Sequence, residues 1–212
     1  MRGAPAYSGV MAKLYFYYAS MNAGKSTTLL QADFNYRERG LHTLLFTAAV
    51  DTRGEPGRIT SRIGLSREAV TFAGDTPLLA LVEAEQARTR LSCVLVDEAQ
   101  FLRRSQVLEL CEVCDRLGIP VLAYGLRTDF RGDLFEGAQW LLALADVLAE
   151  IKAVCGCGRK ATMNLRHDAE GRVAREGAQL AIGGNDRYLA VCRRHFAQGV
   201  REGRLPSFAF AA

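Results

Sequence analysis

The sequence predicts an α/β protein in which helices flank a parallel sheet, with a small cysteine-containing lobe at its C-terminal end. Over residues 13–150, short apolar runs alternate with segments of helical spacing, the pattern of βαβ units that build parallel sheets. From residue 151 onward, closely spaced Gly, Cys and Arg replace that alternation. We therefore expect a leader over 1–12, an α/β domain over 13–150, a lobe over 151–198 and a tail over 199–212.

The expected strands are apolar runs of strand length, each short enough to be a buried strand. In chain order they are Leu14 to Tyr18, Thr43 to Thr47, Cys93 to Val96, Ile119 to Tyr124 and Val147 to Val154. Pro120 lies early in the fourth run, which suits the start of a strand.

The expected helices have apolar residues at helical spacing, and Gly40 and Gly118 provide stop signals for two of them. They cover residues 25–39, 77–90, 103–117 and 136–145. Between the second strand and the second helix, residues 51–75 hold five Gly or Pro residues and four arginines. We expect a long mobile loop there, and such loops in compact domains are often functional.

Composition excludes several classes of protein. The 212 residues are 49% hydrophobic and 24% charged, which rules out wholesale disorder, a collagen-like fibre and a small disulfide-stapled protein. The net charge of +4 divides into −2 over residues 1–150 and +6 over 151–212, too mild to indicate a nucleic-acid partner by itself. No apolar run has membrane-spanning length, and residues 1–12 lack the apolar core of a secretory signal. A cytoplasmic protein with reduced cysteines is expected.

A phosphate-binding loop is indicated directly after the first expected strand. Except for Ala19 in place of the first Gly, the segment matches the pattern G-x-x-x-x-G-K-[ST] of P-loop NTPases with the residues Ala19, Ser20, Met21, Asn22, Ala23, Gly24, Lys25 and Ser26. Gly24 allows a phosphate to approach the backbone, and amides at the following helix start face the anion. Lys25 offers a charge to the β- and γ-phosphates and Ser26 a hydroxyl to Mg²⁺. The alternative is a chance strand–turn–helix corner.

Two carboxylates, Asp97 and Glu98, follow the third expected strand. In open α/β sheets, ligands bind at the carboxyl ends of strands. Asp97 can hold Mg²⁺ directly or through water, and Glu98 can act as a general base for a hydroxyl that attacks phosphorus. The alternative is that both only solvate the strand end. The two motifs indicate a nucleoside triphosphate with Mg²⁺ and leave the phosphate acceptor open between water, a protein, a metabolite and a nucleoside.

Two pairs of metal-ligand residues, separated by 34 residues, are Cys155 with Cys157 and Cys192 with His195. Three thiolates and an imidazole form a closed tetrahedral site for structural Zn²⁺. Unrelated buried thiols are the alternative. The other three cysteines, which are Cys93, Cys111 and Cys114, fit a hydrophobic core.

Two further segments are candidates for ligand contact. Residues 125–132 follow the fourth expected strand, where Phe130 could pack on a flat base and Arg127 or Arg131 could reach a phosphate. Residues 182–188 contain paired glycines, whose exposed backbone can bind the edge of a planar ligand, and Tyr188, which offers a ring face. A solvated loop and a simple turn are the alternatives.

Together, these segments resemble the cytosolic, zinc-containing thymidine kinases of bacteria and vertebrates over about residues 13–198. The resemblance rests on Tyr15 to Tyr18 leading into Met21 to Thr27, on Asp51-Thr52-Arg53, Ser61 to Gly64, Val96 to Phe101, Tyr124 to Gly132, Cys155 to Lys160 and Ile182 to His195. Ala19 departs from the usual P-loop Gly, as in some bacterial members, and Ala99 follows Glu98 where other residues occur.

The resemblance implies transfer of the ATP γ-phosphate to the 5′-hydroxyl of thymidine, with deoxyuridine as a further candidate, in the salvage of DNA precursors. It makes Glu98 the proton acceptor, places the loop Ala19 to Ser26 on the ATP phosphates, and places Asp97, Glu98, Ala99 and Gln100 against the nucleotide. It assigns the nucleoside to Met21, Asp51, Arg53, Phe101, Phe130, Gln179, Leu180, Ala181, Ile182, Gly183 and Tyr188.

Within that set, residues 179–183 and Tyr188 would form a lasso over thymine. A zinc ion on Cys155, Cys157, Cys192 and His195 would anchor the lasso, which lies between the ligand pairs. The resemblance further implies a homotetramer, and neither a nucleic-acid nor a membrane partner is expected.

Two other classes of protein stay open at this point. One is a P-loop ATPase or nucleic-acid-binding module with a zinc ribbon, which would use residues 151–212, with their net charge of +6, as a basic patch. The other is a zinc-stabilised nucleotide-binding regulator without catalysis. Glu98 beside Asp97 speaks against the regulator, because binding alone needs no general base.

Overall fold

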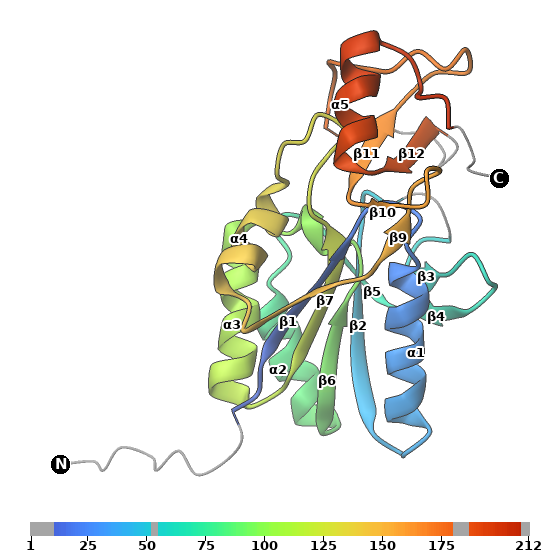
Figure 1. The fold of residues 1–212 in the computed structure, drawn as a ribbon. Coiled ribbons are helices and arrows are strands. Elements are labelled where there is room, and N and C mark those ends of the chain that lie inside the picture. The colour runs from blue at the N-terminus through green and yellow to red at the C-terminus, as the bar shows by residue number, and fades with distance from the viewer. Residues whose placement is uncertain (1–10, 52–54, 180–186, 209–212) are drawn as a thin grey trace.

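The computed structural model describes residues 11–51, 55–179 and 187–208. Its centre is a six-stranded sheet in the order β5-β2-β6-β7-β1-β8 (Figure 1). Every neighbouring pair of strands in this sheet is parallel, as expected from the βαβ pattern. The strands are β1 (Leu14–Ala19), β2 (His42–Ala48), β5 (Val70–Phe72), β6 (Leu91–Val96), β7 (Val121–Leu126) and β8 (Val147–Glu150).

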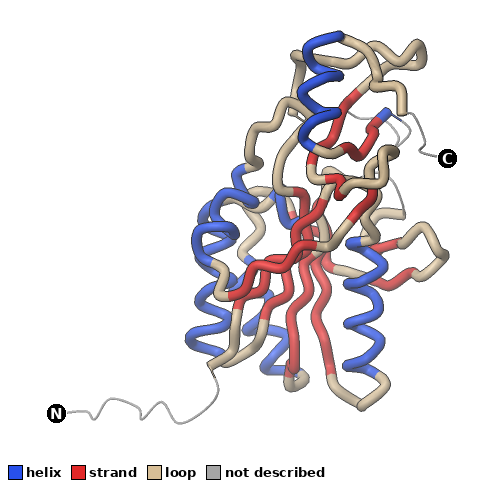
Figure 2. The backbone as a smooth tube through the Cα atoms, viewed as in Figure 1, coloured by secondary structure: helices blue, strands red, loops and turns tan. Residues whose placement is uncertain are grey.

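Helices cover both faces of the sheet (Figure 2). Helix α1 (Lys25–Arg37) packs on one face, while α2 (Leu78–Arg88), α3 (Arg104–Leu117) and α4 (Glu136–Leu144) pack on the other. Alternate residues of each strand serve the two cores, because successive side chains point to opposite faces. Thus Val94 lies in the core under α2 to α4, whereas Leu95 lies with Leu29 in the core under α1.

The expectation of a continuous loop over residues 51–75 is wrong for the described part of that segment. It contains the antiparallel hairpin β3 (Arg58–Thr60) and β4 (Ser66–Glu68), and β5 adds to the sheet beside β2. These strands have three residues each, and β4 is exposed throughout. They carry too little apolar alternation to give a strand signal. The expected strand Val147 to Val154 likewise divides, because only β8 joins the sheet and Ala153–Val154 (β9) pairs elsewhere.

The C-terminal lobe lies over the carboxyl edge of the sheet (Figure 1). It consists of the hairpin β9 with β10 (Lys160–Ala161), the antiparallel pair β11 (Met163–Arg166) and β12 (Tyr188–Val191), and helix α5 (Arg193–Glu202). Its own small core includes Cys155, Leu165, Val191 and Cys192. Helix α5 continues past residue 198, and Leu205 and Phe208 pack against the same core.

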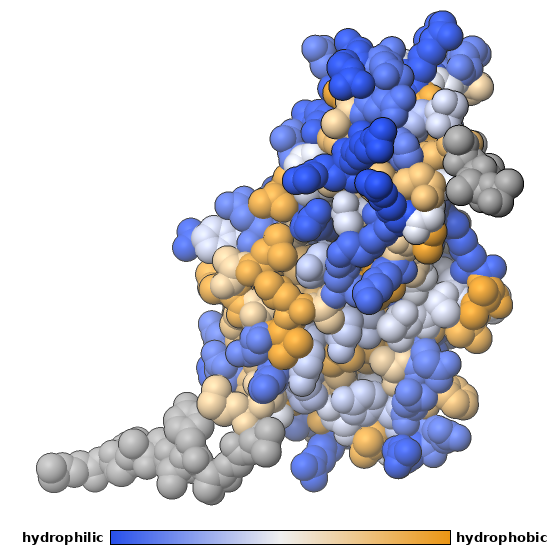
Figure 3. Space-filling view, in the orientation of Figure 1, coloured by the Kyte–Doolittle hydropathy of each residue, from blue (hydrophilic) through white to orange (hydrophobic). Residues whose placement is uncertain are grey.

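Hydrophilic side chains cover much of the visible face of the lobe (Figure 3). Among the described helices, none combines the length and apolar composition that crossing a membrane requires.

Candidate active site

The carboxyl ends of the central strands meet beneath the C-terminal lobe (Figure 1), and a cavity of about 450 Å³ lies there. The cavity brings together three of the sequence-predicted groups, namely the phosphate loop, Asp51 in the segment after β2, and Glu98 after β6. Its lining comprises Asn22, Gly24, Lys25, Ser26, Thr27, Asp51, Arg58, Thr60, Ser61, Arg62, Ile63 and Glu98. Its volume falls within the usual range for small-molecule sites, about 300–1,000 Å³.

The phosphate loop has the backbone of an anion site. Asn22 and Gly24 adopt left-handed conformations, with φ of 65° and 85°, and no side chain caps the start of α1. The amides at the start of α1 are thus left for an anion. Ala19 is not among the positive-φ residues, so the missing first Gly imposes no backbone strain. Lys25 is buried and donates from Nζ to the Ser20 carbonyl at 3.1 Å.

Ser26 and Asp97 form the second part of the site. The Ser26 hydroxyl donates to Asp97 Oδ2 at 2.8 Å. Burial, and then the adjacent charge of Glu98, raise the pKa of Asp97 to about 7, although Ser26 and Lys25 act in the opposite direction. A buried carboxylate whose charge is disfavoured gains from a nearby cation. Hard oxygen donors at this position could therefore hold Mg²⁺.

Glu98 occupies a strained backbone position directly after β6. Its φ of 52° and ψ of 37° are left-handed values that a non-glycine residue rarely adopts. Such strain persists only where surrounding structure enforces it, and it concentrates at functional sites. Although its residue is only 5% exposed, Glu98 lines the cavity.

A hydrogen bond from Gln100 orients the Glu98 carboxylate. Its Nε2 donates to Glu98 Oε2 at 2.5 Å, and its Oε1 accepts from the Leu126 amide at 2.9 Å. Gly125 makes room for this amide, because a Cβ there would lie 2.9 Å from Gln100 Oε1. The sequence prediction placed Ala99 and Gln100 against the nucleotide. In the structure both are buried in the turn under the cavity.

The four predicted metal ligands converge in the C-terminal lobe, with all their donor atoms within 4.8 Å of one another. His195 Nδ1 lies 3.3 Å from Cys155 Sγ and 3.6 Å from Cys192 Sγ, and Cys157 Sγ lies 4.0 Å from Cys192 Sγ. A tetrahedral Zn²⁺ with Zn–S bonds of about 2.3 Å needs donor separations of about 3.8 Å. The donor set and its geometry therefore fit zinc.

Local backbone favours the thiolate form of Cys157, whereas burial raises the pKa of Cys155. The Arg159 amide hydrogen-bonds Cys157 and is the main cause that lowers the pKa of this thiol. Gly158, with φ of 79°, allows the tight turn in which its own amide bonds the Cys155 carbonyl. The other three cysteines do not join a metal cluster among the described residues. Cys93 is buried in the core under α1, whereas Cys114 and the partly buried Cys111 lie in the core on the other face of the sheet.

The predicted nucleoside residues are only partly described. Arg53, Leu180, Ala181, Ile182 and Gly183 lie outside the described residues. Asp51 lines the cavity, and Phe101 packs edge-on against Phe135 at 5.7 Å between centroids. Gln179 donates weakly to the Leu134 carbonyl at 3.4 Å. Tyr188 starts β12 and is half-buried.

Phe130 is not an open shelf for a base, because it is only 1% exposed. The guanidinium carbon of Arg166 lies 3.6 Å from its ring centroid. Arg131, which the sequence offered as a phosphate contact, is engaged with the buried Asp129 carboxylate at 3.0 Å. Arg127 donates to the Thr162 carbonyl at 3.5 Å. The segment after β7 therefore mainly joins the sheet to the lobe.

Sequence reasoning missed several residues of the site. Arg58 and Arg62 line the cavity from the β3–β4 hairpin, and Arg62 hydrogen-bonds the Asn22 side chain. Asn164 on β11 is 2% exposed and accepts from the Met21 amide at 2.7 Å. The four arginines of residues 51–75 were a usable sequence signal for Arg58 and Arg62. No local sequence signal marked Asn164, because its partner Met21 lies 143 residues earlier in the chain.

Comparisons with known proteins point in one direction. The family model described as thymidine kinase matches residues 12–196. A thymidine kinase from Zymomonas mobilis is 62% identical over 188 residues, which cover 89% of this chain and 97% of that protein. One from Novosphingobium aromaticivorans is 65% identical over 190 residues, with coverage of 90% and 99%. One from Legionella pneumophila is 60% identical over 190 residues, with coverage of 89% and 91%.

Proposed function

The chain belongs to the thymidine kinase family, and from this premise we propose that it transfers the γ-phosphate of ATP to the 5′-hydroxyl of thymidine. The observation that carries the proposal is one cavity lined by both the phosphate loop and the strained carboxylate Glu98. A phosphate-binding loop alone suits any nucleotide-binding protein. A carboxylate held beside it adds the proton acceptor that a hydroxyl nucleophile needs.

In this proposal, residues Ala19 to Ser26 hold the ATP phosphates. The uncapped start of α1 faces the anion. Lys25 Nζ, now on the Ser20 carbonyl, lies within the loop and supplies positive charge to the β- and γ-phosphates. Ser26 and Asp97 are the oxygen donors for Mg²⁺. When bound, that ion would neutralise charge on the β- and γ-phosphate oxygens.

The chemical step then needs one base and one electron-pair shift. The 5′-oxygen of thymidine forms a bond to the γ-phosphorus while the bond from this phosphorus to the β–γ bridging oxygen breaks. ADP leaves with that electron pair, and the hydroxyl proton passes to the Glu98 carboxylate. Gln100 holds Glu98 Oε2 at 2.5 Å and so limits the orientations of the carboxylate. General bases of this kind contribute about 10²–10⁴-fold to rate.

The nucleoside would bind across the cavity from the β6 edge toward the lobe. Asp51 lines the cavity and can accept a hydrogen bond from a sugar hydroxyl. Met21 and Phe101 pack against the main core beside the site. We keep Arg53, residues 179–183 and Tyr188 as nucleoside-site residues on the strength of the family resemblance, and Phe130 as a buried residue of that set which supports the site from beneath Arg166. Deoxyuridine is proposed as a second substrate.

Zinc would support the active site indirectly, by stabilising the lobe that contacts the phosphate loop. Its proposed ligands Cys155 and Cys192 are core residues of that lobe, and β11 of the same lobe holds the Met21 amide through Asn164. Closed four-ligand zinc sites stabilise a fold and leave no position for substrate. The proposed zinc is therefore structural.

We also propose a cytoplasmic location and a homotetrameric assembly. A reducing compartment keeps Cys155, Cys157 and Cys192 available as thiolates for the metal. The tetramer follows from the family resemblance, and native mass spectrometry at micromolar concentration tests it directly.

The experiment that tests the activity is ADP release with a panel of acceptors. Purified protein receives Mg²⁺ and ATP together with thymidine, deoxyuridine, uridine or deoxycytidine. We expect ADP release to depend on thymidine and, more weakly, on deoxyuridine. ADP release that is equal with and without any nucleoside would instead support the P-loop ATPase.

A further inference from the structure

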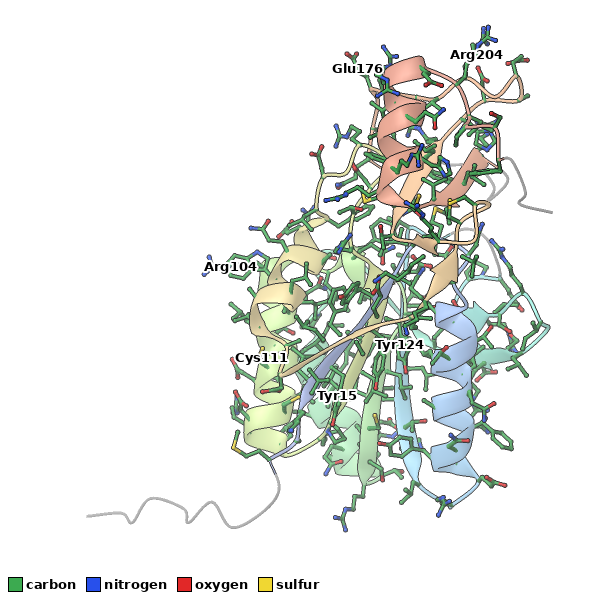
Figure 4. All side chains as sticks on the ribbon, in the orientation of Figure 1. Tyr15, Arg104, Cys111, Tyr124, Glu176 and Arg204 are labelled. Atoms are coloured by element: carbon green, nitrogen blue, oxygen red, sulfur yellow. The ribbon has the colours of Figure 1, made fainter. Side chains whose placement is uncertain are left out.

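Arg166, at the end of β11, joins the segment after β7 to residues 176–178 of the C-terminal lobe. Its guanidinium lies over the Phe130 ring, with 3.6 Å from Cζ to the ring centroid. Its Nη1 donates to the Ala178 carbonyl at 2.9 Å and its Nη2 to the Glu176 carbonyl at 3.0 Å. Figure 4 shows Glu176 beside α5 in this lobe. One side chain thus fixes an aromatic ring and a stretch of main chain in a single arrangement.

The geometry requires arginine rather than any cation. A planar guanidinium can stack on a ring with its face while its N–H groups bind two carbonyls in its plane. The ammonium group of lysine is compact and has no planar face, so it cannot make the stack and the paired carbonyl contacts together. Both carbonyls belong to residues that flank Gly177, so the chain here bends around the guanidinium.

Gly177 fits this arrangement from the opposite side. Its φ is 123°, and a Cβ on it would lie 2.4 Å from Arg166 Nη2. Real Cβ atoms do not approach so closely, so a side chain at 177 would displace the guanidinium. Arg166 and Gly177 are therefore complementary, and either can be changed to disturb the same contact.

The location of this contact connects it to the nucleoside site. In the β11–β12 ladder, Arg166 is paired directly with Tyr188. Phe130, under the guanidinium, and Gln179, which follows the bound carbonyls, belong to the same proposed set of nucleoside residues. We propose that Arg166 is a positioning residue: stacked on the buried Phe130 ring, it orders the main chain of residues 176–178, which leads into Gln179, for nucleoside binding. This inference rests on the proposed function.

The expected effect is confined to one substrate. Neither Arg166 nor Gly177 lines the cavity beside the phosphate loop, so ATP binding and the proton acceptor should be untouched. Loss of a stacked cation and two charge-assisted hydrogen bonds should raise KM for thymidine about tenfold or more. We expect kcat and KM for ATP to stay within about twofold of wild type.

Two variants and two matched controls test the inference. Arg166→Lys keeps the charge and removes the planar fork, whereas Gly177→Ala displaces the fork and leaves Arg166 intact. Arg172→Lys is the control for the first, because Arg172 is an exposed arginine of the same lobe that pairs with Asp168. Gly171→Ala is the control for the second. Gly171 also has a positive φ of 75°, but a Cβ there meets only Leu205, at 3.8 Å or more.

Steady-state kinetics with each substrate varied in turn give the result, with zinc content and melting temperature measured on every protein. A selective rise in KM for thymidine in both variants, absent from both controls, supports the positioning role. Values equal to those of the controls, or a parallel loss in kcat and in both KM values, would overturn it. If Arg166→Lys does not fold, Gly177→Ala decides alone. A wild-type protein that phosphorylates no thymidine refutes the proposed function itself and removes the basis of this inference.

Discussion

Replacing Glu98 with Gln should lower kcat strongly while the protein still folds. The amide keeps the size and shape of the carboxylate, so Gln100 Nε2 can still donate to the remaining side-chain oxygen. The backbone strain at this position, with φ of 52°, is the same for both residues. What changes is the ability to accept a proton from the attacking hydroxyl. We expect kcat to fall about 10²–10⁴-fold, the usual contribution of a general base.

The same substitution should stabilise the nucleotide-free protein above neutral pH. Burial and the Glu98 charge raise the pKa of Asp97 to about 7. A raised carboxyl pKa lowers the free energy of unfolding progressively as pH rises from the ordinary value of about 4 through the folded value. Glu98→Gln removes one of the causes. We expect its melting temperature to exceed that of wild type at pH 8 and the difference to vanish below about pH 4.

The assay combines coupled ADP release with thermal unfolding, without Mg²⁺ or nucleotide in the unfolding experiment. Glu112→Gln is the control, because Glu112 pairs with Arg116 on the surface of α3 and should show neither effect. A Glu98→Gln protein with kcat within about threefold of wild type would place the base elsewhere. A melting temperature that falls at pH 8 would refute the electrostatic reasoning about Asp97.

Three further outcomes follow from the contacts around the site. Ser26→Ala should raise KM for MgATP about tenfold, because it removes a hydroxyl that bonds Asp97 at 2.8 Å; an unchanged KM in an Mg²⁺ titration would exclude Ser26 from the cation site. Asn164→Leu leaves the Met21 amide without its 2.7 Å acceptor and should raise KM for ATP about tenfold, with Met163→Leu as the unaffected neighbour. Cys192→Ser should lose the metal and lower the melting temperature; elemental analysis that still finds about one zinc per folded chain would contradict the four-ligand site.

Much of the fold could be predicted because its elements carry strong local patterns. The runs that became β1, β2, β6 and β7 are short and apolar, and Gly40 and Gly118 mark where two of the helical segments stop. Strand order and the hairpin β3–β4 could not be predicted. Hydrogen bonds to neighbouring strands, rather than local composition, define three-residue strands such as Ser66–Glu68.

In the candidate site, too, residues in local motifs could be predicted and residues that act through long-range contacts could not. Lys25 and Glu98 belong to short motifs whose spacing is set by chemistry, so the sequence alone marks them. The predicted zinc ligands are likewise found together in the structure. Asn164 and Arg166 act through long-range contacts that no local pattern encodes. The role expected of Phe130 depended on exposure, and packing against Arg166 leaves that ring buried.

The central claim is that a nucleoside hydroxyl, rather than water, receives the phosphate at the cavity beside Glu98. The most direct measurement is the fate of the γ-phosphate of labelled ATP when wild-type protein is incubated with Mg²⁺ and thymidine. Chromatography with mass spectrometry should find the label in thymidine 5′-monophosphate, in equal amount to the ADP formed. Label that appears only as inorganic phosphate, at a rate independent of thymidine, would contradict the account.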